Sequence, residues 1–196
     1  MSTDREGANL DQDPRWQHLI DRAWVCRSCG KTHSGIFDIT YSHPSLWDGA
    51  DECTPNSELG ASTHFLAEDF CVINNEHFFV RCVLLLPVSG SGGRWFGFGV
   101  WSSLSKTNFK HYAKGFNTSE YEDPGPWFGW FSNQLSGYAS TSSLKCQVHP
   151  RDQRQRPLIK LEPTDHPLAR EQRDGITFDR LLDIYAAHGH DIRGAL

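Results

Sequence analysis

Residues 70–88, with the sequence FCVINNEHFFVRCVLLLPV, decide the fold class of this 196-residue chain. Two runs rich in β-branched and aromatic residues flank the triplet Asn74-Asn75-Glu76, a composition typical of a tight turn between antiparallel strands. The stretch therefore predicts a β-hairpin. Within its second run lies Cys82, whose thiol we expect to act as a small buried hydrophobic group.

Further strands are predicted on the C-terminal side of this hairpin. Residues 94–104, RWFGFGVWSSL, predict a third strand in which Gly97 and Gly99 mark a bulge or the close approach of another group. An aromatic ring packed on that face is the favoured occupant. Residues 143–149 and 157–163, SLKCQVH and PLIKLEP, predict a second hairpin joined by a polar segment.

Three short helices are expected around these strands. Their N-terminal caps are predicted at Asp13, which is followed by Pro14, at Ser105 and at Thr177, because each polar side chain precedes a run with apolar residues at helical spacing. The last of these helices is expected to stop at Gly189. The fold class is therefore α+β: a mainly antiparallel sheet with flanking short helices and a zinc-knuckle-like N-terminal element.

The length suits one globular domain, predicted over residues 13–190 between a flexible N-terminal tail, residues 1–12, and a C-terminal tail, residues 191–196. The net charge of -5, with no cluster of Lys and Arg, argues against a nucleic-acid partner. The longest apolar run, VLLLPV, is too short for a membrane span. Because the N-terminus is polar and lacks the apolar region of a secretory signal, a cytoplasmic location is expected.

Residues 24–35, WVCRSCGKTHSG, contain the clearest chemical motif. A Cys-x-x-Cys-Gly turn directs the thiols of Cys26 and Cys29 toward one point, which favours a zinc knuckle. Zinc needs four ligands in a structural site. The nearest further candidate is His33 and the best distant one is Cys71, with His43 and Cys53 as runners-up. A redox-active pair and two uncoordinated thiols remain the alternatives.

Residues 161–177, LEPTDHPLAREQRDGIT, bring several polar side chains onto a short predicted helix that begins near Pro167 and stops at Gly175. Asp165 or Thr164 is the expected cap. A histidine beside carboxylates can act as an acid, a base or a metal ligand. The candidates for catalysis are Glu162, Asp165, His166 and Glu171. A hydrogen-bonded clamp is the favoured interpretation, and His111, His149, His188 and His190 are expected to be solvated or to cap helices.

The order of WVCRSCGKTH, EDFCVINNEHFFVRCVLLLPV, FGFGVWSSLSKTNF, PWFGWFSNQLSGY and LIKLEPTDHPLAREQRDGIT resembles the bacterial domain of unknown function 2199 family over about residues 24–185. The resemblance implies a one-domain soluble bacterial protein. It supports two sets of residues as positions of the family's sequence motifs, and it leaves Cys53 out of the ligand set. These are Cys26, Cys29, His33 and Cys71 in the first set and Glu162, Asp165, His166, Glu171 and Gln172 in the second.

Three functions follow from these observations as hypotheses. The first is a non-enzymatic domain that holds structural zinc and binds a protein or small-molecule partner. The second is a metal-dependent enzyme of a specialised bacterial pathway that uses His166 and nearby carboxylates. The third is a thiol redox protein acting through Cys26 and Cys29.

Overall fold

The computed structural model describes residues 9–49, 53–56, 63–118, 120–121, 123–152 and 154–196. Most of the predicted N-terminal tail, residues 1–8, lies outside this range, whereas its last residues form a 3-10 helix, η1 (Leu10–Gln12). The chain divides into two compact units. Unit 1 comprises Met1–Ile39, Leu85–Gly97 and Asp165–Leu196, and unit 2 comprises Thr40–Leu84 and Phe98–Thr164.

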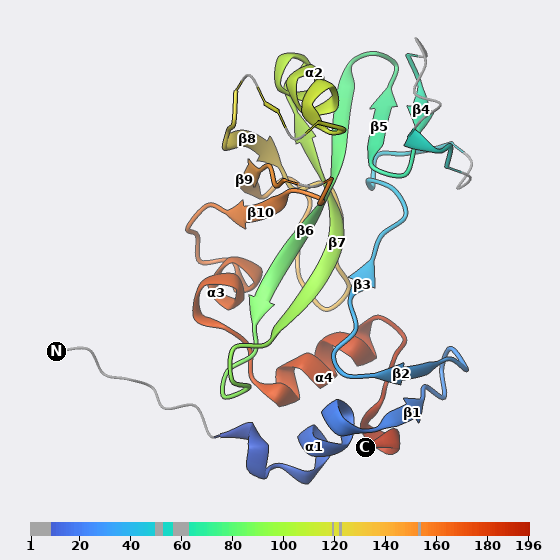
Figure 1. The fold of residues 1–196 in the computed structure, drawn as a ribbon, viewed down its shortest axis with the longest axis vertical. Helices are drawn as coiled ribbons and strands as arrows, with labels where there is room; N and C mark the ends of the chain where they lie inside the picture. The colour runs from blue at the N-terminus through green and yellow to red at the C-terminus, as the bar shows by residue number, and fades with distance from the viewer. Residues whose placement is uncertain (1–8, 50–52, 57–62, 119, 122, 153) are drawn as a thin grey trace, which may run out of the picture. The chain divides into compact units, whose positions relative to one another are not determined.

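Unit 1 combines helices from both ends of the chain with a small two-stranded sheet (Figure 1). Its further elements are α1 (Pro14–Asp21), β1 (Ala23–Val25), β2 (Thr32–Ser34), α3 (Pro167–Asp174), α4 (Phe178–Ala187) and η3 (Arg193–Ala195). Aromatic side chains form its core: the ring of Phe37 stacks on Tyr185 with centroids 4.2 Å apart, and Trp16 meets Phe178 edge-on at 5.2 Å. Such pairs bury a large apolar area in defined geometry. They therefore hold both α1 and the segment around Phe37 against α4.

The larger sheet has the strand order β3-β7-β6-β10-β9-β8, and β5 and β4 extend it from β6. Its strands are β3 (Ile39–Thr40), β4 (Phe65–Leu66), β5 (Phe70–Ile73), β6 (His77–Pro87), β7 (Trp95–Leu104), β8 (Trp127–Trp130), β9 (Lys145–His149) and β10 (Leu158–Leu161). One helix, α2 (Lys106–Gly115), follows β7. The predicted α+β class is confirmed.

The sheet is mixed and not purely antiparallel. Both predicted hairpins, β5–β6 and β9–β10, are antiparallel, but β10 pairs in parallel with β6 through Leu158 and Val83. A parallel pair needs a long connection, and here β7, α2, β8 and β9 all lie between the two strands in sequence. Such a pairing between distant segments cannot be read from local alternation of side chains.

The turn of the first hairpin follows the prediction. Asn74 and Asn75 both have positive φ, 52° and 56°, a region that asparagine tolerates better than most residues. In the adjacent strands, Cys71 and Cys82 are fully buried. The expectation that Cys82 packs as a small hydrophobic group agrees with this burial.

The two glycines of β7 accommodate a close neighbour, as predicted. The prediction that this neighbour is an aromatic ring was wrong. A Cβ atom on Gly97 would lie 2.7 Å from Oδ1 of Asp38, and one on Gly99 would lie 2.8 Å from Cγ2 of Thr40. The segment around β3 runs directly against β7, because the Tyr41 N–H donates to the Gly99 carbonyl at 2.8 Å. The space that the glycines leave is therefore filled by this strand segment and not by a ring.

All three predicted helix caps are confirmed. Side-chain oxygens of Asp13, Ser105 and Thr177 accept hydrogen bonds from backbone N–H groups in the first turns of α1, α2 and α4. Each cap satisfies a donor that the helix itself leaves without a partner. No helix among the described residues has the length and apolar character needed to cross a bilayer.

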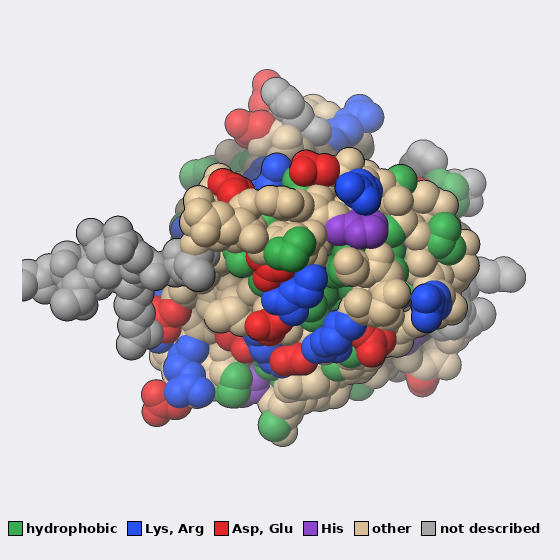
Figure 2. Space-filling model, turned by 90° about the horizontal axis from the view of Figure 1, so that it is seen from below, with side chains coloured by type: hydrophobic (Ala, Val, Ile, Leu, Met, Phe, Trp, Pro, Cys, Tyr) green, Lys and Arg blue, Asp and Glu red, His purple; other side chains and the backbone are tan. Residues whose placement is uncertain are grey.

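Figure 2 shows one face of the molecule on which acidic and basic side chains are interspersed. A surface that binds a polyanion needs cations gathered on one side. On this face, neither sign of charge gathers into a patch of its own.

Candidate metal centre

The knuckle is a tight turn between β1 and β2. These strands pair antiparallel, with Trp24 opposite His33 and Val25 opposite Thr32. Two hydrogen bonds close the turn: the Cys26 N–H donates to the Lys31 carbonyl at 2.9 Å, and the Gly30 N–H donates to the Cys26 carbonyl at 2.8 Å. Gly30 has a φ of 69°, a conformation that glycine adopts without steric cost. The turn therefore places Cys26 and Cys29 close together.

The end of α4 brings a further ligand to this turn. Gly189, with a φ of 79°, reverses the chain, and its N–H donates to the Ala186 carbonyl at 3.1 Å. The His190 N–H then donates to the Tyr185 carbonyl at 2.8 Å, as in the common glycine-terminated helix end. As a result, Nδ1 of His190 lies 3.6 Å from Sγ of Cys26, although the two residues are 164 positions apart.

Cys26, Cys29 and His190 form a group that could hold a metal ion. Their three ligand atoms all lie within 4.8 Å of one another. Beside them, Nε2 of His33 lies 3.4 Å from Sγ of Cys29. Two ligands bound to one tetrahedral zinc, at the usual Zn–S and Zn–N distances, are separated by roughly 3.4–3.8 Å. The two sulfur–nitrogen distances at the knuckle, Cys26 to His190 and Cys29 to His33, match this spacing.

The protonation states also suit metal binding. Cys26 is covered by its neighbours but lies close to the surface. Burial disfavours its thiolate, yet hydrogen bonds from His190 and from the N–H groups of Cys29 and Ser28 outweigh burial and lower the thiol pKa to about 6. Burial, together with the charges of His190 and Lys31, lowers the pKa of His33. A thiolate and a neutral imidazole are the forms that bind zinc.

Aromatic rings hold the two imidazoles in place. The ring of His33 stacks on Trp24 at 5.1 Å and lies 4.4 Å from Phe37. Phe37 also meets His190 edge-on at 5.5 Å. The Tyr185 hydroxyl donates to the Phe37 carbonyl at 2.9 Å and accepts from the Phe37 N–H at 3.0 Å. Such surroundings fix the orientation of ligand rings, a role that supporting residues commonly have at metal sites.

The fourth ligand candidate from the sequence, Cys71, lies in different surroundings. It belongs to β5 in unit 2, where it is fully buried in a hydrophobic cluster. The other members of this cluster are Leu66, Ile73, Phe79 and Trp101. Burial raises the pKa of the Cys71 thiol to about 12, which disfavours the thiolate that a metal needs.

The sequence interpretation of His190 as a solvated or capping residue missed its position beside Cys26. A weak signal was present, since a glycine that stops a helix also turns the chain back and can present the next side chain to a neighbouring element. Without the tertiary structure, nothing indicates that this neighbour is the knuckle.

The polar motif near the last strand forms local structural contacts. His166, and not the expected Asp165 or Thr164, caps α3, since its Nδ1 accepts a hydrogen bond from the Leu168 N–H at 3.1 Å. Glu171 pairs with Arg180 of α4 at 2.7 Å.

The remaining two candidates of this motif lie apart from these contacts. Asp165 is exposed, and Glu162 belongs to unit 2, where its N–H donates to the Lys145 carbonyl at 2.9 Å. The contacts of His166 and Glu171 are those of a cap and a clamp, and a catalytic role for the motif stays a prediction.

No curated protein and no solved structure matches the chain. A family model described as an uncharacterized protein conserved in bacteria, DUF2199, matches residues 25–176. The matched segment includes Cys26, Cys29, His33 and Cys71, whereas His190 lies beyond it. Because the match covers most of the chain and confirms the resemblance seen in the motifs, the protein belongs to the DUF2199 family of bacterial proteins.

Proposed function

We propose that this protein is a non-enzymatic binding domain whose unit 1 is held together by one structural zinc ion. The ligands in this proposal are Cys26, Cys29, His33 and His190. The observation that carries it is the convergence of three ligand atoms within 4.8 Å from segments 164 residues apart in sequence.

A structural role is favoured because four protein ligands would close the tetrahedron. A catalytic zinc normally keeps one position for water or substrate. In the closed arrangement the zinc ties the knuckle to the segment that follows α4. Since the unfolded chain lacks the preformed site, the binding free energy of the metal becomes folding free energy of unit 1.

The first test is the metal content of the protein purified under reducing conditions. We expect one zinc per chain in the wild type and loss of zinc in Cys26→Ser, Cys29→Ser and His190→Ala. Cys53→Ser is the matched control, because Cys53 is also exposed but lies outside the group. Zinc-free wild type that keeps the same thermal stability as the untreated protein would contradict a structural ion.

A second test asks whether Cys71 is a metal ligand, as the sequence predicted, or a buried apolar side chain. Replacing zinc by cobalt(II) gives a thiolate-to-metal absorption band whose intensity follows the number of bound thiolates. We expect the intensity of two thiolates, unchanged in Cys71→Ser although this variant loses packing in the hydrophobic cluster. A band of three thiolates that falls in Cys71→Ser would instead place Cys71 among the ligands.

Replacing His33 tests whether the zinc site is closed, with four protein ligands, or open, with three protein ligands and a water molecule. We expect His33→Ala to bind zinc about 10-fold or more weakly, as is usual when a zinc site loses one contributor. Unchanged zinc affinity in this variant would show that water and not His33 occupies the fourth position. Such an open site is what a metal-dependent enzyme would have. If the protein is instead isolated without metal and with a reversible Cys26–Cys29 disulfide, the result favours the thiol redox hypothesis.

A further inference from the structure

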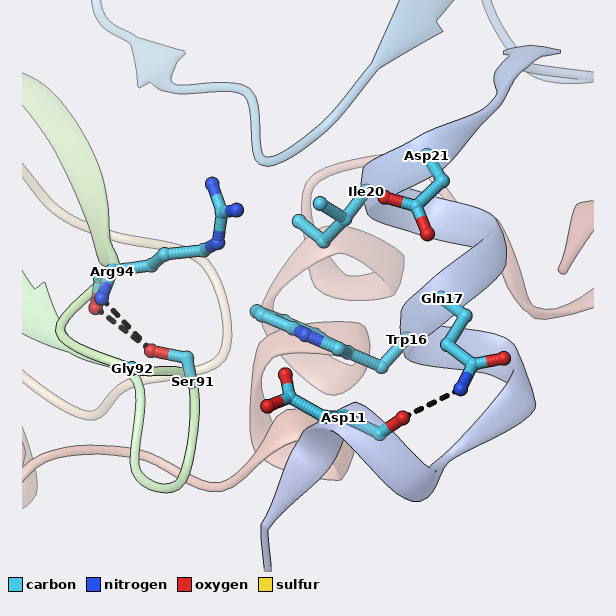
Figure 3. A pocket seen from close by; sticks show the side chains of 8 residues that line it. All are labelled: Asp11, Trp16, Gln17, Ile20, Asp21, Ser91, Gly92 and Arg94. Atoms are coloured by element: carbon cyan, nitrogen blue, oxygen red, sulfur yellow. Dashed lines mark hydrogen bonds between the residues drawn. The ribbon is translucent and has the colours of Figure 1, made fainter.

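A cavity of about 650 Å³ lies in unit 1, lined by η1, α1 and the loop between β6 and β7. Figure 3 shows Arg94 extending from the loop toward α1, with Asp11 and Asp21 on the other sides of the space. Trp16 and Ile20 supply its apolar lining. The volume is within the range of pockets that take small organic ligands.

The elements around this cavity are tied to one another. The Gln17 side chain donates to the Asp11 carbonyl at 2.5 Å, which joins α1 to η1. The Leu10 N–H donates to the Gly90 carbonyl at 3.1 Å, which joins η1 to the loop. A site whose walls are already fixed loses little conformational entropy when a ligand binds.

The loop itself is held by a buried serine. The Ser91 hydroxyl donates to the Val88 carbonyl at 2.6 Å and accepts from the Arg94 N–H at 2.9 Å. These bonds fix the backbone from which the Arg94 side chain extends. On the opposite wall, Trp16 is only 3% exposed and packs on Phe178, so its ring is also held.

The charged groups of this cavity have not neutralised one another. In the described part of the chain, neither the guanidinium of Arg94 nor the carboxylates of Asp11 and Asp21 form an ion pair or hydrogen bond. Opposite charges that face one cavity without meeting can be bridged by a ligand that carries both signs. A guanidinium matches a carboxylate, and carboxylates match an ammonium group.

We propose that this cavity binds a free amino acid with an apolar side chain. The ligand carboxylate faces Arg94, its ammonium group faces Asp11 and Asp21, and its side chain lies against Trp16 and Ile20. Because the three charged side chains are exposed to solvent, each charge pair contributes modestly and the affinity is expected in the millimolar range. This site is separate from the zinc ligands, so its test does not depend on the metal.

The test compares L-phenylalanine with two analogues that each lack one charge, phenethylamine and 3-phenylpropanoate. Binding is measured by calorimetry or by nuclear magnetic resonance titration of the full chain as purified. We expect saturable binding of L-phenylalanine and about 5- to 10-fold weaker binding of either analogue. The proposal is overturned if L-phenylalanine shows no saturation at millimolar concentrations or binds no better than both analogues.

Substitutions assign each charge to its partner. In Arg94→Gln, L-phenylalanine should bind only as well as phenethylamine, since the carboxylate has lost its partner. In the Asp11→Asn, Asp21→Asn double variant it should bind only as well as 3-phenylpropanoate. Arg22→Gln is the control, because it removes an exposed arginine next to Asp21 that does not line the cavity. Equal affinity for L-phenylalanine in Arg94→Gln and wild type would also overturn the proposal.

Discussion

At the scale of single residues, the cysteines show how surroundings determine chemistry. The Cys26 thiol receives hydrogen bonds from His190 and from two backbone N–H groups, and its pKa falls to about 6. Burial raises the pKa of Cys71 to about 12, and it raises that of Cys146 to about 11 although the Ser102 hydroxyl hydrogen-bonds the Cys146 sulfur. At neutral pH, Cys26 is therefore ready to bind a metal, whereas Cys71 and Cys146 act as apolar side chains.

His149 offers a test of pH dependence that is independent of the metal. Burial, and secondly the charge of Lys160, lower the pKa of His149 below its ordinary value of 6.5. The unfolded chain therefore binds the proton first as the pH falls, so the contribution of His149 to stability is complete above pH 6.5 and declines below it. We expect the urea midpoint of the wild type to fall more than that of His149→Gln between about pH 7.5 and about pH 5.5.

Lys160→Gln serves as the companion variant for this measurement. Removing the lysine charge makes protonation of His149 less unfavourable, so the loss of stability between the two pH values should be smaller than in the wild type. Parallel pH profiles for wild type and His149→Gln would show that this histidine contributes nothing to acid sensitivity.

At the scale of elements, short helices depend on their ends. α3 has eight residues and begins at Pro167, directly after a histidine whose ring accepts a bond from the Leu168 N–H. The helix is then linked to α4 by the partly buried pair of Glu171 and Arg180. A cap contributes about 1 kcal/mol, and a partly exposed ion pair contributes up to about 1 kcal/mol. Both are significant for a helix of two turns.

Substitution of His166 separates a capping role from a catalytic one. We expect His166→Ala to lower the free energy of unfolding by about 1 kcal/mol, and His166→Asn to restore most of it, since asparagine is among the best capping residues. Chemical denaturation measures both values. Equal destabilisation by alanine and asparagine would show that the imidazole has a function other than capping.

At the scale of the whole molecule, the proposed zinc connects the two ends of the chain within unit 1. The knuckle lies near the N-terminus, and His190 lies six positions before the C-terminal residue, Leu196. A metal that joins such distant segments suppresses local opening of both. Unit 2 contains most of the larger sheet and the hydrophobic cluster around Cys71, and it holds none of the proposed ligands.

Hydrogen exchange before and after chelation tests this arrangement. We expect exchange to rise in residues 23–34 and in the backbone around His190, because chelation removes the metal ion that joins these two segments. Exchange in the β9–β10 hairpin, which belongs to unit 2, should change little and provides the internal control. A uniform rise across both units would show instead that the ion supports the fold as a whole.

The amino-acid sequence alone determined the local features of this protein. Hairpins at residues 70–88 and 143–163, the caps at Asp13, Ser105 and Thr177, and the close pair of Cys26 and Cys29 all depend on neighbours a few residues away. The α+β class followed from the same periodicities. Such features are predictable because turn chemistry, capping and alternation act over short distances along the chain.

Only the tertiary structure decided which distant residues meet. It placed Asp38 and Thr40 against the glycines of β7, paired β10 in parallel with β6, and brought His190 to Cys26. It also placed Cys71 in an apolar cluster and gave His166 the capping position. These contacts depend on how separate elements pack and on the depth at which each side chain is buried, and neither quantity is encoded in any short stretch of sequence.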